Sequence, residues 1–307
     1  MITTLLLQKI AELLLMLLMG YALVKTGVLR TDDSMILSKL SLYLFSPCTI
    51  VMAFQVEYDA ALLGKLGFSA LLSLLIHLFL FLFAGGLRKV LKLDTVEEAS
   101  VIYSNAGNLV IPLVSYVLGE EWVIYCSAFL AVQLFFLWTH GAYLFQKGAG
   151  FQWKKILLNI NLLAIAAGFL LMILRIRLPQ ILGETFQSMG DMLGPAAMLI
   201  TGMLAAGISL RKVLQNQRIY LVAVLRLLVV PGCLLLVLKG LMAAGVIAHG
   251  SYQILVTFFA VMTPAASTIT QLAQIHNRNA SYAGAINIVT TLGCMITMPI
   301  LVWLYLL

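Results

Sequence analysis

Charged residues are scarce in this sequence. Lys, Arg, Asp and Glu together make up 10% of its 307 residues, whereas hydrophobic residues make up 62% and the mean hydropathy is +1.05. Charged residues form about a quarter of an ordinary soluble domain, so the composition excludes that class. Because helices satisfy their own backbone polar groups in lipid, the sequence predicts an all-α integral membrane protein.

Signatures of enzymes and metal sites are also missing. There is no H-E-x-x-H zinc motif, no Gly-rich phosphate loop and no stretch that reads as a soluble domain. Residues 207–210 resemble part of an intramembrane serine protease motif, but no matching His accompanies them. The four cysteines fall inside apolar stretches without paired metal spacing, and we interpret them as small core residues. We therefore expect no enzymatic activity, no metal and no cofactor.

Long apolar stretches, by contrast, recur from end to end with short connections. About 20 apolar residues suffice to cross the hydrocarbon layer as a helix. The first stretch lacks a basic leader and a small-residue cleavage site, so we interpret it as a membrane helix and not a signal peptide. The predicted spans cover residues 4–24, 34–56, 66–84, 97–118, 122–146, 155–175, 187–208, 219–241, 251–275 and 281–306.

Basic residues are distributed unevenly between the two ends of these spans. Most Lys and Arg, among them Lys25, Arg88, Lys89, Lys155 and Arg211, fall at ends that would face the same side. Lys and Arg accumulate on the cytoplasmic side of membrane proteins. The net charge of +7 is therefore a topological signal that does not call for a nucleic-acid partner, and it predicts a multi-pass cell-membrane protein with both termini outside.

The sequence also contains a weak internal repeat. Gly20 and Gly168, like Pro47 and Pro195, are separated by 148 residues; Pro112 and Pro264, like Thr139 and Thr291, are separated by 152. Many transporters consist of repeats with opposite orientation. An odd number of helices per half inverts the second half, so the pattern predicts two inverted five-helix repeats, residues 1–148 and 149–307.

The fourth and ninth spans carry helix-breaking residues at their centres. The fourth contains "SNAGNLVIP" (104–112) and the ninth "TPAAST" (263–268). We expect half-helices to begin near Pro112 and after Pro264, because proline suits the first turn of a helix. Their N-termini would then meet at mid-membrane, where unpaired amides and about half a positive elementary charge each favour an anion.

Uncharged polar residues surround both predicted breaks: Ser104, Asn105, Asn108, Thr263, Ser267 and Thr268. A crossed-helix proton exchanger needs an intramembrane carboxylate, and none occurs at these positions. Neutral donors can hold a substrate carboxylate without repelling it. The competing interpretation is that these groups only satisfy the interrupted backbone.

Several collinear motifs resemble the auxin efflux carrier family, which includes bacterial carriers and the plant PIN proteins. The family pattern of Asn, Gly and Pro in helix 4 is matched by Asn105, Gly107 and Pro112. Further matches are "GYALVKTGVL" in helix 1, "NINLLAIAAGFLL" in helix 6, "RLLVVP" in helix 8, "TPAASTITQLA" in helix 9 and "TTLGCMITMPILVWL" in helix 10.

This resemblance implies interrupted, crossing helices 4 and 9, as in bile-acid transporters and sodium–proton antiporters. It implies a scaffold of helices 1, 2, 6 and 7, a transport domain of helices 3–5 and 8–10, and elevator-type alternating access. The implied substrate is a carboxylate, either auxin-like or a dicarboxylate such as malate or malonate. The expected partners are this anion, membrane lipid and, through the scaffold, a second copy in a homodimer.

Carried over by position, Asn105 would contact the substrate carboxylate and Asn161 would supply a second polar contact. The family's Asn-Pro-Asn segment reads Asn159-Ile160-Asn161 here. Trp138 stands where the plant carriers have Tyr, and Val110 replaces a common Gly, so these two positions depart from the pattern.

Other polar residues lie inside predicted spans. Gln133 and Asn287 are expected either to bond between helices, as is usual in lipid, or to contact the ligand. Arg226 would either brace carbonyls at a break or bind an anion, and His77 is interpreted as a neutral donor. The predicted binding residues are Asn105, Gly107, Asn108, Pro112, Gln133, Trp138, Asn161, Thr263, Pro264, Ser267, Thr268 and Asn287.

The leading hypothesis is thus a secondary carrier for an organic anion. The alternatives are a membrane solute sensor without transport and a cation-coupled exchanger of the same fold. An inverted repeat favours a carrier, because sensing requires no symmetry between inward and outward states. The sequence leaves open whether H⁺ or Na⁺ is coupled.

Overall fold

The computed structural model describes the chain except residues 1, 57–59, 147–156, 208–212, 214 and 249, and some side chains inside its helices. The described residues are helical, with no strand beyond one isolated bridge. The first half contains α1 (Ile2–Lys25), η1 (Thr31–Asp33), α2 (Ser34–Leu40), η2 (Ser41–Phe45), α3 (Ser46–Ala53), α4 (Ala60–Leu91), α5 (Thr95–Ile102), α6 (Ala106–Leu118), η3 (Glu120–Trp122), α7 (Val123–Phe136), η4 (Leu137–Gly141) and α8 (Ala142–Gln146).

The second half continues the same pattern of helical segments. It contains α10 (Ile160–Ile173), α11 (Gln180–Asp191), α12 (Leu193–Gly207), α14 (Gln217–Val224), η5 (Leu225–Val229), α15 (Val230–Ala243), α16 (Tyr252–Met262), α17 (Ser267–Ile275) and α18 (Ala280–Leu306). The η2, η4 and η5 segments are π-helical turns that continue their neighbours, whereas η1 and η3 are 3-10 turns.

Six helical segments among the described residues are long and apolar enough to cross a membrane. They cover Thr31–Ala53, Ala61–Leu91, Glu120–Phe145, Gln180–Gly207, Gln217–Ala243 and Ala280–Leu306. Shorter apolar helices cover Ala106–Leu118, Ile160–Ile173 and Tyr252–Met262. The predicted all-α membrane class is confirmed, and the count of ten spans in two inverted repeats stays a prediction.

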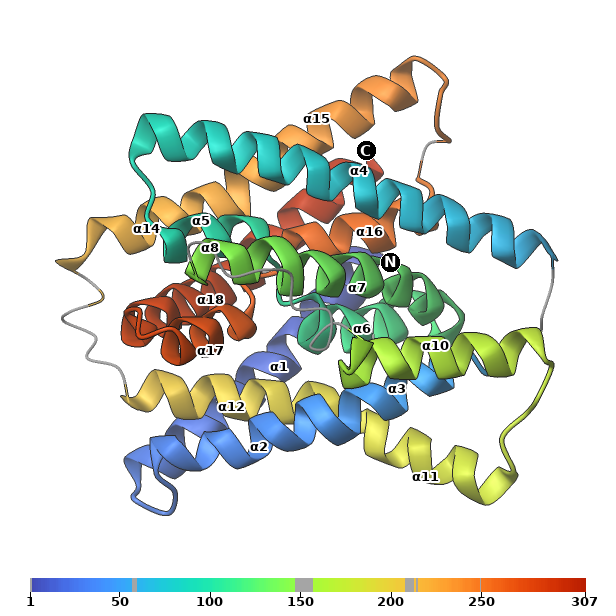
Figure 1. Cartoon of the computed structure of the whole chain (residues 1–307), viewed down its shortest axis with the longest axis horizontal. Helices are drawn as coiled ribbons and strands as arrows, with labels where there is room; N and C mark the ends of the chain where they lie inside the picture. The colour runs from blue at the N-terminus through green and yellow to red at the C-terminus, as the bar shows by residue number, and fades with distance from the viewer. Residues whose placement is uncertain (1, 57–59, 147–156, 208–212, 214, 249) are drawn as a thin grey trace.

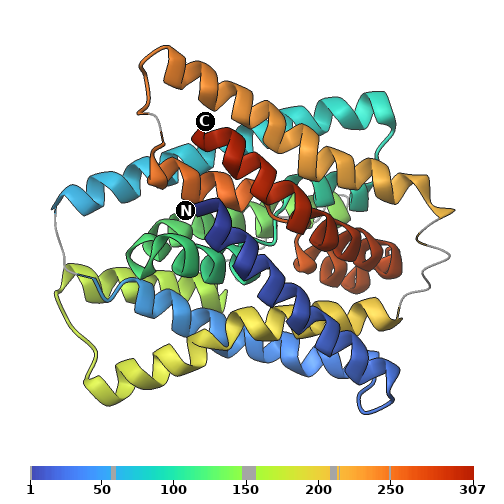
Figure 2. The same cartoon turned by 180° about the vertical axis from the view of Figure 1, so that it is seen from behind.

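The helices pack in two groups (Figure 1). One group contains α1, α2, α3, α10, α11 and α12, with α1 against α12 and α3 against α10 and α11. The other contains α4 to α8 and α14 to α18, with α4 against α7 and α18 against α14 and α17. Seen from behind, α1 crosses α12 and lies beside α18 (Figure 2), so α1 borders both groups.

Helices α1 and α12 approach closely because each has a glycine at the contact. A Cβ at Gly202 would lie 1.9 Å from the Leu17 carbonyl oxygen, and one at Gly20 would lie 2.3 Å from that of Leu199. Close backbone contact of this kind is the main source of helix association in lipid, where the hydrophobic effect between helices is absent.

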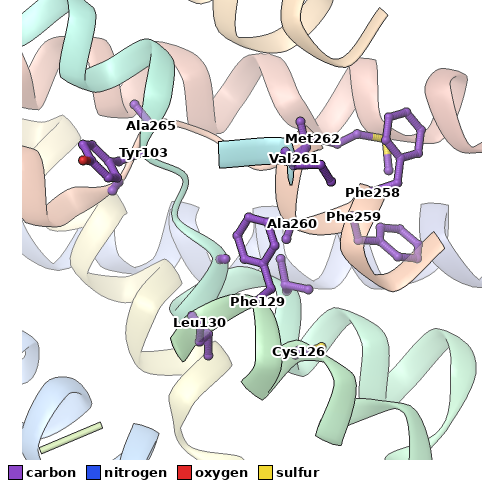
Figure 3. Packing of buried hydrophobic residues seen from close by; sticks show 14 of the residues in the cluster. Tyr103, Cys126, Phe129, Leu130, Phe258, Phe259, Ala260, Val261, Met262 and Ala265 are labelled. Atoms are coloured by element: carbon purple, nitrogen blue, oxygen red, sulfur yellow. The ribbon is translucent and has the colours of Figure 1, made fainter. Parts of the chain in front are cut away.

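The most deeply buried part of the molecule is formed by the interrupted helices. All residues from Ile254 to Met262 in α16 are buried, and so are Val101 to Tyr103 at the end of α5. Figure 3 shows Tyr103 and Ala265 side by side next to this core. Large exposed apolar side chains instead lie on peripheral helices, for example Leu82 of α4 and Leu236 of α15, as expected for surfaces that face lipid.

Candidate functional site

The chain breaks between α5 and α6 and between α16 and α17 meet and satisfy each other's backbone. The Asn105 N–H donates to the Pro264 carbonyl at 2.9 Å, and the Ala266 N–H donates to the Tyr103 carbonyl at 2.9 Å. The two breaks thus form a short antiparallel bridge. Backbone groups buried away from water need such partners, so the pairing explains how two helices can be interrupted at the centre of the protein.

Polar side chains from neighbouring helices brace each break. Gln133 of α7 accepts hydrogen bonds from the Ser104 N–H (3.1 Å) and Oγ (2.6 Å), and its amide nitrogen donates to the Ser104 carbonyl (2.9 Å). Asn287 of α18 donates to the Ala265 carbonyl (2.6 Å), and Thr290 Oγ1 accepts from the Ala265 N–H (3.1 Å). The two amides therefore take the interhelical bonding role that was one of the two predicted for them.

Arg226 lies on the opposite side of the breaks, where the first halves end. Its side chain is fully buried. Its Nε donates to the Thr263 carbonyl (3.0 Å), and its Nη1 donates to the Val101 carbonyl (2.9 Å), with the Ile102 carbonyl at 3.4 Å. Of its two predicted roles, bracing carbonyls at a helix break is the one observed.

The N-terminus of α6 lacks a side-chain cap. Asn105 occupies the cap position with φ −81° and ψ 44°, but its side chain accepts no hydrogen bond from the first amides of the helix. At α10, by contrast, the Asn159 side chain accepts from the Asn161 and Leu162 amides. An uncapped helix start leaves amide donors and positive potential available to a ligand.

A cavity of about 70 Å³ lies beside this helix start, between the two groups of helices. It brings together Asn105, Asn108, Gln133 and Asn161 from three helices and one helix cap. None of the described residues that line it is charged. The described residues of the lining are Leu42, Ser46, Ser104, Asn105, Gly107, Asn108, Leu130, Gln133, Leu134, Leu137, Asn161, Ala266 and Thr268.

Three side chains at the cavity have unused hydrogen-bonding capacity. Asn105, Asn108 and Thr268 are partly exposed and make no side-chain hydrogen bond with the groups that the structure describes. Asn105 and Asn108 flank the start of α6, and Thr268 lies in the first turn of α17. These groups and the first amides of both helices can donate to an anion placed between them.

Leu42 and Ser46 lie in the cavity wall and were not among the predicted binding residues. Ser46 Oγ donates to Asn161 Oδ1 at 2.8 Å, and both side chains are buried. This bond holds Asn161 toward the cavity from the side opposite to Asn105. A polar residue directly before Pro47 in an apolar stretch was the signal available for Ser46.

One wall of the cavity is apolar. Leu130 and Leu134 of α7 and Leu137 of η4 line it on successive turns of one helical run. The cavity therefore offers polar groups at the helix starts and a hydrocarbon surface beside them. This combination suits a ligand with an anionic head and an apolar body.

The prediction that a half-helix begins near Pro112 is wrong. Helix α6 begins at Ala106, and Pro112 lies inside it. Pairing with the other break and the bonds from Gln133 place the interruption at residues 103–105, while the helix tolerates Pro112 because the proline removes only one backbone donor. The break in the second half does contain Pro264, as predicted, and α17 begins at Ser267.

Pro112 borders a second cavity, of about 280 Å³, further along α6. This cavity also lies between the two groups of helices and is lined from α1, α3, α6, η3, α7, α11 and α12. Unlike the first cavity, it has the carboxylates of Glu120 and Asp191 in its lining. Glu120 accepts from Ser115 Oγ (2.8 Å), and Asp191 accepts from Gln187 (2.9 Å).

The structure does not bring all predicted binding residues to the first cavity. Thr263 and Pro264 are buried in the second break, where their carbonyls accept from Arg226 and Asn105. Asn287 is occupied at Ala265, and Ser267 begins α17 without lining the cavity. The side chain of Trp138 lies outside the described residues.

His77 is buried on α4, away from the lining of both cavities. Its Nδ1 lies 2.7 Å from the Ser73 carbonyl, and its ring lies against Phe81, Phe129 and Phe136. A neutral imidazole that donates to a carbonyl one turn earlier fits this apolar surrounding, in line with its predicted role.

Interrupted helices whose breaks meet inside a helical membrane protein are typical of membrane transport proteins. The sequence model of a family described as membrane transport protein matches residues 5–151 and 147–302. The chain belongs to this family, the family of the auxin efflux carriers that its motifs resemble, and it is a multi-pass membrane transporter. This is a family of transporters and not of enzymes. A comparison with curated proteins found no match.

Proposed function

We propose that this protein is a secondary carrier for an organic carboxylate, which binds in the cavity at the start of α6. The observation that carries the proposal is the electrostatic character of that cavity. Two helix N-termini contribute positive potential, three side chains offer unused donors or acceptors, and none of the described residues in the wall is charged. An anion is the ligand that compensates such a site.

In this proposal the carboxylate accepts hydrogen bonds from Asn105, from the first amides of α6, and from Thr268. Hydrogen bonds to a charged group contribute about 1.5–3 kcal/mol each, so a few of them suffice for binding. Asn161, held by Ser46, would reach the ligand from the other group of helices.

The apolar wall supports a substrate with one carboxylate and a hydrocarbon or aromatic body. Leu130, Leu134 and Leu137 would cover this body. A second carboxylate, as in malate or malonate, would meet leucine side chains and lose its hydration without a partner. Between the two predicted substrate types, the lining therefore favours the auxin-like one.

Transport would follow from sliding of one helix group along the other, with α1, α2, α3 and α10 to α12 as scaffold. Two features support this elevator motion: the packing in two groups, and the two cavities along α6 at their boundary. With the termini outside, the first cavity lies toward the cytoplasmic half and the second toward the outer half. The inverted five-helix repeats supply the two equivalent end states.

A cation-coupled exchanger is the less favoured alternative, because no Asp or Glu is among the described residues that line the cavity at the helix starts. A sensor without transport has no feature of the described residues in its favour. The coupling ion, if the carrier uses one, would bind elsewhere in the molecule.

Replacement of Asn105 by Ala tests the proposal. It removes the donor at the uncapped helix start without creating a cavity in the core, so the protein should remain folded. We expect uptake of an aromatic carboxylate into proteoliposomes to fall by about 10- to 100-fold, the value of one hydrogen bond to a charge.

Asn279→Ala is the matched control. Asn279 caps α18 by accepting from the Tyr282 amide, and it is not among the described residues that line the cavity. Loss of this cap should lower stability by about 1 kcal/mol and leave uptake unchanged. Saturable uptake by Asn105→Ala equal to that of the unaltered protein would refute the site.

A further inference from the structure

Arg226 occupies an unusual electrostatic position at the crossing, the place where the break between α5 and α6 meets the break between α16 and α17. It lies in the π-helical turn η5, is completely buried, and forms no ion pair with a carboxylate among the described residues. All of its observed partners are backbone carbonyls, those of Val101, Ile102 and Thr263. A buried guanidinium without a carboxylate requires another source of negative charge.

The three carbonyls supply this charge, because they lie at the C-terminal ends of α5 and α16. Each helix end carries about half a negative elementary charge on carbonyls that have no amide partner. Two such ends add to about one negative charge, which the guanidinium balances. In many transporters with broken helices, carbonyls at such ends bind a coupling cation.

The hydrogen bonds alone do not explain the arginine. Its Nη2 is buried without a hydrogen-bond partner among the described groups, so the site does not use the full donor set of a guanidinium. A neutral amide could also donate hydrogen bonds to carbonyls, at lower desolvation cost. What the neutral amide would lack is the positive charge.

We propose that Arg226 is a tethered cation, a positioning residue that takes the place of a free monovalent cation at the C-terminal ends of α5 and α16. While its side chain is present, the crossing needs no Na⁺ or K⁺ for its integrity. When the side chain is removed, the same carbonyls form a site for a small planar cation, and free guanidinium is the ion that fits the space.

Thermal unfolding of purified variants without substrate tests this inference. Arg226→Ala should unfold at least about 5 °C below the unaltered protein, because the negative C-terminal ends of α5 and α16 lose the buried cation that balances them. Millimolar guanidinium chloride should restore at least half of that loss in a saturable manner, with NaCl less effective and choline chloride inactive. The unaltered protein should not respond.

Two substitutions separate charge from hydrogen bonding. Arg226→Lys keeps the charge and should stay within a few degrees of the unaltered protein, whereas Arg226→Gln keeps donors without charge and should unfold nearly as early as Arg226→Ala. This pair decides the question even if Arg226→Ala is not recovered in folded form. A Gln variant as stable as the unaltered protein, or an Ala variant that ignores guanidinium, would overturn the proposal.

Arg218→Ala is the matched control. Arg218 also donates to two carbonyls, those of Leu91 and Lys92, but it is partly exposed and pairs with Glu97. Its loss should destabilise the protein without creating a guanidinium response. These unfolding measurements contain no substrate. They can therefore refute the role of Arg226 while the uptake result for Asn105 stands, and the uptake result can refute the substrate site without affecting the role of Arg226.

Discussion

The two ends of the crossing differ in how their charge is balanced. At the C-terminal ends of α5 and α16, the protein supplies its own cation, the buried guanidinium of Arg226. At the N-terminal starts of α6 and α17, the described residues supply no anion, and those that line the adjoining cavity are neutral. The difference teaches that the helix-end charge is balanced within the protein on the side of Arg226 and is left unbalanced on the side that would receive a substrate.

The same contrast separates α6 from α10 within the cavity wall. Asn159 caps α10 from within the chain, whereas Asn105 holds the cap position of α6 without capping it. An asparagine at a helix start normally accepts from the amides behind it. The uncapped start is therefore the place where a ligand carboxylate can replace a missing protein group.

The largest effect is expected from a substitution that places a negative charge at the uncapped start of α6. Asn105→Asp places a carboxylate beside the first amides of α6, where it would act as cap and occupy the anion position. We expect saturable anion uptake to disappear, while stability rises by about 0.5–2 kcal/mol. Uptake assays and thermal unfolding of the same preparation measure both. Loss of uptake with loss of stability would indicate misfolding and not compensation.

A second, smaller effect should distinguish the two breaks. Gln133→Leu leaves the buried Ser104 amide and carbonyl without partners and should cost about 2–4 kcal/mol in stability. Asn287→Leu removes one bond to Ala265 and should cost about 1–3 kcal/mol. Only Gln133 lines the cavity, so only its loss should weaken ligand affinity by about tenfold or more.

Chemical denaturation and calorimetric titration of these two variants give the required comparison. Equal losses of affinity would show that the second break also contacts the ligand, contrary to the placement of Asn287 outside the cavity.

The smallest effect concerns the pair that reaches the cavity from the opposite group of helices. Asn161→Ala should weaken ligand affinity by about tenfold, and Ser46→Ala by a few-fold, because Ser46 acts through the orientation of Asn161. The double variant should match Asn161→Ala alone. Fully additive losses, measured as dissociation constants, would mean that Ser46 contacts the ligand itself.

Composition was sufficient to predict the class of protein, since apolar stretches of membrane length leave few alternatives. Asn105 and Gln133 could also be found from the sequence as polar residues in apolar stretches, and Asn161 from the resemblance to the family, although their separation in the chain hid their convergence. The position of the first break could not be predicted from Pro112. It is set by contacts with residues 264–266 and Gln133, which are distant in sequence.

The partners of Arg226 also could not be predicted from the sequence. An isolated arginine in an apolar stretch signals an essential role, but its partners are carbonyls, which every residue carries. No side-chain pattern in the sequence marks which carbonyls are left unpaired. Ser46 was missed for a related reason, because serine is common in membrane helices and its partner lies on α10.

Isothermal titration of the purified protein with a matched pair of ligands tests the central claim most directly. Phenylacetate and phenylacetamide have the same apolar body and differ in the charge of the head group. The uncompensated helix starts predict saturable binding of the carboxylate at least about 100-fold tighter than that of the amide, with the preference lost in Asn105→Asp. Equal affinity for the two ligands, or a carboxylate preference that survives in Asn105→Asp, would contradict the account.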